Sequence, residues 1–126
     1  MKKGLDWRVT AALGAALWGS WALYANWEAG VGSAGLSAVT QAAISASSIT
    51  LLSLLANRVL ARSWPSPVVQ IITATVIPYS VLLSLVITSH LIVGTHNIVR
   101  TIVPSASVGI AYCVLYATKN RRRLAP

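Results

Sequence analysis

Residues 67–93, PVVQIITATVIPYSVLLSLVITSHLIV, are almost purely apolar and decide the fold. No charged residue and no histidine lies between Arg62 and His90. The hydrocarbon core of a bilayer is about 30 Å thick, so a helix needs roughly 20 mainly apolar residues to cross it. The stretch therefore predicts a membrane-spanning helix. Pro78 should kink it, because proline cannot donate to the carbonyl of Ala74, and Thr75 or a neighbouring helix could donate instead.

Three further apolar segments complete the predicted architecture. Residues 7–27 begin and end with tryptophan, which favours membrane interfaces, and residues 35–55 and 98–118 form the second and fourth spans. The turn at 94–97 is short, so we expect the third and fourth spans to be antiparallel neighbours. Pro104 predicts a second kink. The sequence thus predicts an all-α, four-helix membrane bundle that forms one domain over residues 1–126.

Small and polar residues recur at helical spacing in the first two spans. Ala11, Ala15 and Gly19 form a ridge that lets another backbone approach closely. The second span carries a polar face made by Ser37, Gln41, Ser45 and Ser48. We therefore expect this span to be covered by its neighbours.

The distribution of charge predicts the topology. Only 10% of the residues are charged, against roughly 25% in typical soluble domains. With four spans, nine of the ten Lys and Arg residues fall on one side, which predicts cytoplasmic termini in a bacterial-type inner membrane. The nine are Lys2, Lys3, Arg8, Arg58, Arg62, Lys119, Arg121, Arg122 and Arg123, and Arg100 lies on the other side. No basic face can form on helices this apolar, so nucleic-acid binding is not expected.

Two groups of polar residues are candidate sites. The first is a polar corridor along the spans, and interhelical hydrogen bonds, worth about 0.6 kcal/mol each, fit the same pattern. The second is a cluster at the outer mouth that could recognise an anionic group such as a lipid phosphate, or simply face headgroups. The corridor consists of Gln41, Gln70, Thr73, Ser80, Ser84 and Tyr112, and the outer mouth of His90, His96, Asn97 and Arg100.

Catalytic, metal and cofactor chemistry finds little support. The only carboxylates, Asp6 and Glu28, lie at opposite ends of the first span and cannot act together. Cys113 should lie about 20 Å from His90 along the membrane normal, too far to share a metal with it. We therefore expect no enzyme activity, no cofactor and no metal, and a buried apolar role for Cys113.

The sequence favours a transport-type protein, such as a permease, a channel or a lipid flippase subunit. Its path would run between the third and fourth spans. The alternative is a non-catalytic structural or assembly subunit of a larger membrane complex, which the absence of intramembrane charge favours. A chain this short is expected to act as a homo-oligomer or within a complex. The cytoplasmic tail, residues 119–126, should hold anionic headgroups through Arg121, Arg122 and Arg123.

Overall fold

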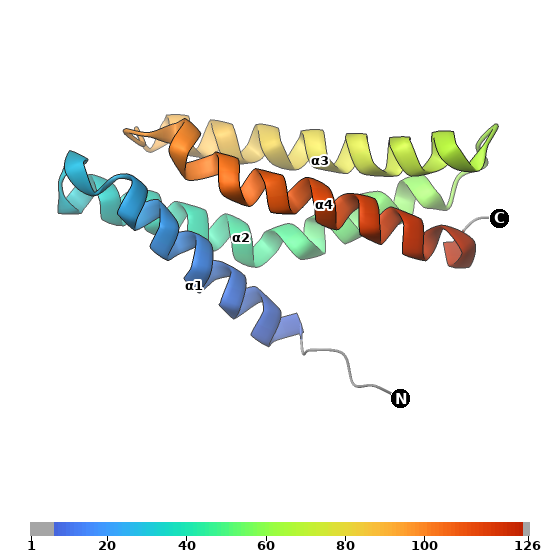
Figure 1. The fold of residues 1–126 in the computed structure, drawn as a ribbon, viewed down its shortest axis with the longest axis horizontal. Coiled ribbons are helices and arrows are strands. Elements are labelled where there is room, and N and C mark those ends of the chain that lie inside the picture. Colours follow the sequence, from blue (N-terminus) through green and yellow to red (C-terminus); the bar gives the residue numbers. More distant parts are fainter. Residues whose placement is uncertain (1–6, 125–126) are drawn as a thin grey trace. The chain divides into compact units, whose positions relative to one another are not determined.

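The computed structural model describes residues 7–124, and the side chains of residues 8–122. Lys2, Lys3 and Asp6 lie outside this range, as does the side chain of Arg123. The described chain is all-helical, as predicted (Figure 1). It comprises α1 (Trp7–Ala25), a short 3-10 helix (Trp27–Ala29), α2 (Val31–Leu60), α3 (Pro67–Ile92) and α4 (Ile98–Leu124).

Three of these helices are long and apolar enough to cross a membrane, which indicates a multi-pass membrane protein. They are Val31–Leu60, Pro67–Ile92 and Ile98–Arg122. The predicted first span corresponds to α1, which is not among the three; Arg8 and several Trp, Gly and Ser residues dilute its apolar character. A fourth crossing, and with it the inward placement of both termini, stays a prediction.

The ends of the helices follow from local chemistry. Pro67 opens α3, where a missing N–H does no harm, and the Ser66 hydroxyl accepts the N–H of Val69 at 3.2 Å. The first two predicted spans leave residues 28–34 between them, but α2 already begins at Val31, after the short 3-10 helix. Gly30, with φ of 92°, makes the break, and α2 begins at the next residue. Pro78 and Pro104 lie inside α3 and α4, and the kinks at these positions stay predictions.

The described contacts divide the chain into two compact units. Unit 1 consists of Met1–Ile49 and Val86–Val103, and unit 2 consists of Thr50–Leu85 and Pro104–Pro126. Each unit is held by its own contacts between helices, and α2, α3 and α4 contribute a part to both.

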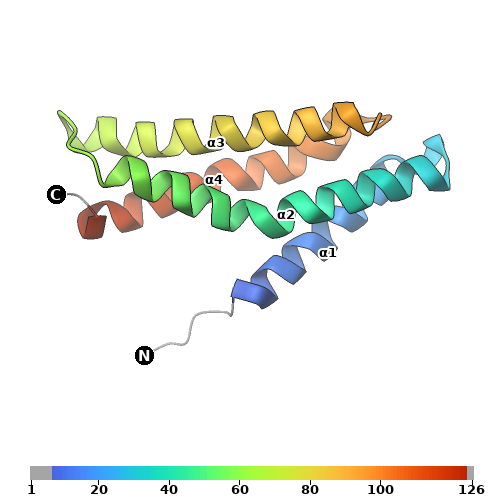
Figure 2. The same cartoon turned by 180° about the vertical axis from the view of Figure 1, so that it is seen from behind.

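In unit 1, Gly19 brings α1 against the first half of α2 (Figure 2). A Cβ added at Gly19 would lie 3.1 Å from the Ala42 Cβ and 3.3 Å from the Ala38 carbonyl oxygen. The predicted small-residue ridge thus meets α2 closely at this position. Neither neighbour is the end of a flexible side chain, so neither can move aside without shifting α2.

The substitution Gly19→Ala is expected to destabilise the protein. Alanine gains about 1 kcal/mol of helix propensity, but overpacking costs about 1–3 kcal/mol, so we expect a net loss of up to about 2 kcal/mol. Gly14→Ala is the matched control, because its Cβ would meet only the Ser45 carbonyl at 3.9 Å. The control should gain stability. Free energies of unfolding from SDS titration measure both, and a stabilised Gly19→Ala protein would contradict this packing.

Unit 2 has a small apolar core with polar ties at its edges. Leu60, Ala74 and Ala117 form the core, and Val59 and Ile71 pack against it. Hydrogen bonds join α2 to α4 and close the end of α2. They run from Tyr116 to Asn57 at 2.9 Å, between Ser53 and Tyr112 at 3.4 Å, from Gln70 to the Leu60 carbonyl at 2.8 Å, and from Trp64 to the Val59 carbonyl at 2.8 Å. Cys113 is buried, as predicted.

Candidate functional site

His90 is the centre of a buried polar network in unit 1. Its side chain has no exposed surface. The Nδ1 atom lies 2.7 Å from the Thr95 hydroxyl, and Nε2 lies 2.8 Å from the Gln41 side-chain oxygen. The Ser37 hydroxyl donates to the Thr95 hydroxyl at 3.1 Å, and the Gln41 amide donates to the Ser45 hydroxyl at 3.5 Å. These five residues are called the His90 network below.

The hydrogen bonds of the His90 network all run in one direction. The Gln41 oxygen can only accept, so Nε2 of His90 carries the hydrogen and Nδ1 accepts from Thr95. Thr95 in turn accepts from Ser37. In this order the neutral imidazole is the Nε2–H tautomer. Bonds aligned in this way polarise one another in a low-dielectric interior.

Two local features of the chain build this network. Ser37, Gln41 and Ser45 recur every fourth residue, so they share one face of α2, and all three are buried. On the other side, Gly94 ends α3 in a left-handed conformation, with φ of 68°. The amides of Gly94 and Thr95 then bond back to the carbonyls of Leu91 and His90, at 3.2 and 2.9 Å. This C-cap places the Thr95 hydroxyl beside the His90 ring.

Asn26 joins the end of α1 to the start of α4 in the same unit. Its amide nitrogen donates to the Ala22 carbonyl and to the Thr101 hydroxyl, both at 2.8 Å. Its oxygen accepts the backbone N–H of Asn97 at 2.8 Å. Thr101 donates to the Asn97 carbonyl at 2.7 Å. Asn26 therefore supplies an acceptor for one of the amides that the start of α4 leaves unpaired.

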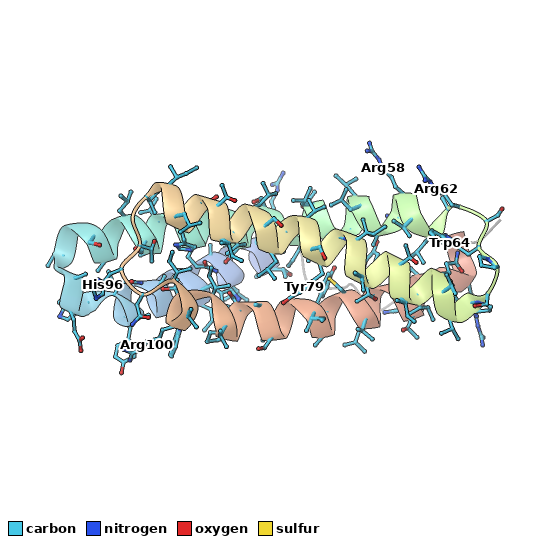
Figure 3. The ribbon with its side chains drawn as sticks, turned by 90° about the horizontal axis from the view of Figure 1, so that it is seen from above. Arg58, Arg62, Trp64, Tyr79, His96 and Arg100 are labelled. Atoms are coloured by element: carbon cyan, nitrogen blue, oxygen red, sulfur yellow. The ribbon has the colours of Figure 1, made fainter. Side chains whose placement is uncertain are left out.

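Arg100 lies on the outside of this junction (Figure 3). Its guanidinium carbon is 5.1 Å from the centre of the Tyr24 ring, within the range of a cation–π contact. The Trp21 indole donates to the backbone carbonyl of Arg100 at 2.8 Å, which supplies the acceptor that this tryptophan needs. Two side chains of α1, those of Trp21 and Tyr24, and the side chain of Asn26 just after it thus contact the first turn of α4 and the residue before it.

The residues of the predicted outer mouth contact different partners. His90 is buried and bonds to Gln41 and Thr95, whereas Arg100 is exposed and packs on Tyr24. His96 is exposed at the turn (Figure 3), and Asn97 binds Asn26 through its backbone. No hydrogen bond between described residues joins His90 to Arg100. Recognition of an anion by the four residues stays a prediction.

The residues of the predicted corridor are divided between the units. Gln41 belongs to the His90 network in unit 1, and the other residues lie in unit 2. Gln70 is buried against the Leu60 carbonyl, and Tyr112 pairs with Ser53. Thr73 bonds to the carbonyl of Val69, and the exposed Ser84 bonds to that of Ser80, which is also exposed. These last hydroxyls are satisfied within α3 itself, and the corridor stays a prediction.

Both ring nitrogens of His90 are already bonded to side chains, so metal binding would require one of these bonds to break. Among the residues that the structure describes, no three His, Cys, Asp or Glu side chains come together. The chemistry that the network offers is hydrogen bonding: hydroxyls, an amide and an imidazole held inside a membrane helix bundle.

Fold and site together define a multi-pass helical membrane protein with a polar, histidine-centred interior. Comparison with protein-family models, with curated proteins and with solved structures finds no match to this chain.

Proposed function

We propose that this chain is a transport-type membrane protein, a permease, channel or lipid flippase subunit, whose His90 network contacts the moving polar group. One observation carries the proposal: His90 is fully buried in a helix that is apolar enough to cross a membrane. Ionisable side chains in such helices are costly to bury and commonly mark the pathway of a substrate or an ion. Around it, Ser37, Gln41 and Thr95 supply donors and acceptors that could exchange partners with a polar substrate.

The proposed topology has four spans with both termini on the cytoplasmic side of a bacterial-type inner membrane. It is supported by the ten Lys and Arg residues, of which only Arg100 falls on the far side. Within unit 2, Arg58 and Arg62 point outward near the end of α2 (Figure 3), and the hydrogen bond from Tyr116 to Asn57 joins the last turns of α2 to the turn of α4 that precedes its basic end. The resulting basic end would hold anionic headgroups, with Arg121 to Arg123 in the tail.

The proposed path follows α3 and α4, with His96, Asn97 and Arg100 at its outer mouth. In unit 2, Tyr79 lies between these helices (Figure 3). Its hydroxyl donates to the Ala106 carbonyl at 3.1 Å, and its ring lies 3.7 Å from where a Cβ on Gly109 would be. A substrate on this path would have to displace the Tyr79 ring. In the transport proposal, the Tyr79 side chain therefore acts as the gate that must move to open the path.

Liposome assays test the proposal. We expect the reconstituted protein to move either protons, measured with an entrapped pH-sensitive dye, or a fluorescent phospholipid, measured by dithionite quenching, faster than protein-free liposomes. His90→Gln should reduce that rate several-fold, because glutamine keeps a hydrogen-bond donor and acceptor at the site but cannot take up a proton or reproduce the imidazole geometry. Arg100→Gln should reduce it if the outer mouth is used. Asn57→Gln, outside both sites, serves as the control.

A structural or assembly subunit is the second candidate, and one observation favours it. The hydroxyl, amide and imidazole groups of the His90 network all have protein partners, which is also how a purely structural tie is built. On this alternative, neither flux would exceed the background, and the protein purified in mild detergent would hold other membrane subunits in a fixed ratio. The same preparation would show whether the chain forms a homo-oligomer, which we propose for the transport-type protein. No catalytic role or cofactor is proposed.

A further inference from the structure

Thr75 carries a buried hydroxyl that no other described residue satisfies. Its side chain is 6% exposed, and among the described side chains its oxygen is the one buried polar atom without a hydrogen-bond partner. Threonines in helices usually donate to a carbonyl of the preceding turn. Thr73, Thr101 and Thr118 do so in this chain, at 2.7 to 2.8 Å. Thr75 therefore departs from a pattern that its neighbour Thr73 follows.

The residue before Thr75 has a carbonyl that lacks its usual helical donor. Ala74 has no exposed surface, and the residue four positions later, which would normally donate to its carbonyl, is Pro78. Proline has no N–H. From the sequence, the Thr75 hydroxyl could donate to the Ala74 carbonyl in place of the missing amide, but the structure shows no such bond. A buried acceptor and a buried hydroxyl thus stand on consecutive residues of α3, inside unit 2.

We propose that Ala74 and Thr75 hold one ordered water molecule. Water can donate to the Ala74 carbonyl and exchange a second hydrogen bond with the Thr75 hydroxyl, and buried waters commonly have two to four such partners. A metal cation fits less well, because a hard cation takes about six or more oxygen ligands. Leu60 and Ala117, which cluster with Ala74, offer no oxygen side chain. The site is independent of the transport proposal, and it would stabilise α3 where the missing amide weakens it.

The proposed water site is tested by whether Thr75→Val raises or lowers the unfolding equilibrium constant. With a bound water, Thr75→Val removes one of its partners and should raise the unfolding equilibrium constant on the order of fivefold. In the Pro78→Ala background, a backbone amide is restored to the Ala74 carbonyl, the water is no longer needed, and Thr75→Val should lower the constant. Without a water, valine simply replaces an unsatisfied hydroxyl, and Thr75→Val should stabilise the protein in both backgrounds.

The measurements are SDS unfolding in bicelles for the four proteins of this cycle, with Thr73→Val as the control for removal of a threonine hydroxyl on the same helix. NMR magnetisation transfer from water to the Thr75 amide supplies a readout that does not depend on stability. A reversal of sign together with a water cross-peak supports the site. The same sign in both backgrounds overturns it, and so does stabilisation by sodium or potassium at constant ionic strength, which would assign the site to a cation.

Discussion

His90→Leu is expected to lower the free energy of unfolding by about 2–4 kcal/mol, because it removes one hydrogen bond from each of two buried side chains. Leucine fills a similar volume, but it cannot accept from Thr95 or donate to Gln41, which lie 2.7 and 2.8 Å from the imidazole. Hydrogen bonds in membrane bundles average only about 0.6 kcal/mol. We expect more here because His90 has no exposed surface, so neither lipid headgroups nor bulk water can replace what is lost.

The control for this prediction is the other histidine. His96 is exposed, and His96→Leu should change the free energy of unfolding by no more than about 0.5 kcal/mol. The double variant His90→Leu with Gln41→Leu should recover part of the loss, since removal of both partners is less costly than removal of one. SDS titration of the wild type, His90→Leu, Gln41→Leu and the double variant gives the coupling energy between the two residues. Equal effects at His90 and His96 would rule out the His90 network as a buried tie.

Asn26→Leu is expected to cost about 2–3 kcal/mol and to loosen the start of α4. Leucine is close in size to asparagine, so packing changes little, while three hydrogen bonds at 2.8 Å disappear. The loss leaves the Asn97 amide, at the start of α4, without its acceptor. Hydrogen exchange at the Asn97 amide should therefore become several-fold faster than in the wild type.

Asn57→Leu is the matched comparison in unit 2. Asn57 is only partly buried and accepts one bond, from Tyr116 at 2.9 Å. Its loss should cost less than about 1 kcal/mol and leave exchange at Asn97 unchanged. If Asn26→Leu proved no more costly than Asn57→Leu, the contact between α1 and the start of α4 would not contribute to stability as the bond geometry indicates.

Helix positions were largely predictable because their signals are local. Pro67 and Gly94 act through their own backbone chemistry, so the predicted third span, 67–93, nearly coincides with α3. Hydropathy located the other helices but not their ends: α1 stops two residues before the predicted 27, and α2 and α4 run past the predicted 55 and 118. It reports only the apolar part, whereas a helix continues through polar residues until something breaks it. For this reason α2 extends to Leu60 and α4 reaches Leu124, through lysine and arginine, which favour helices.

The site was less predictable because its contacts are long-range. Periodicity correctly placed Ser37, Gln41 and Ser45 on one buried face, whereas Ser48, the fourth residue predicted there, is only partly buried. It could not reveal that His90, 49 residues away, is the partner of Gln41. Nor could periodicity show which hydroxyls of α3 face a neighbouring helix. Ser84, for example, is exposed and bonds to a carbonyl of its own helix. Asn26 was not recognised; an amide at the end of an apolar run is the one signal that it offered.

The distance along the chain between Gln41 and His90 has a consequence for biosynthesis. Ribosomes add about 5–20 residues per second, so His90 is made roughly 2–10 seconds after Gln41. During that interval the Gln41 side chain on the polar face of α2 has no imidazole to bind. The Gly94 cap, whose bonds span only three to five residues, can form as soon as its own residues emerge. The turn between α3 and α4 can therefore form before these helices pack against α2.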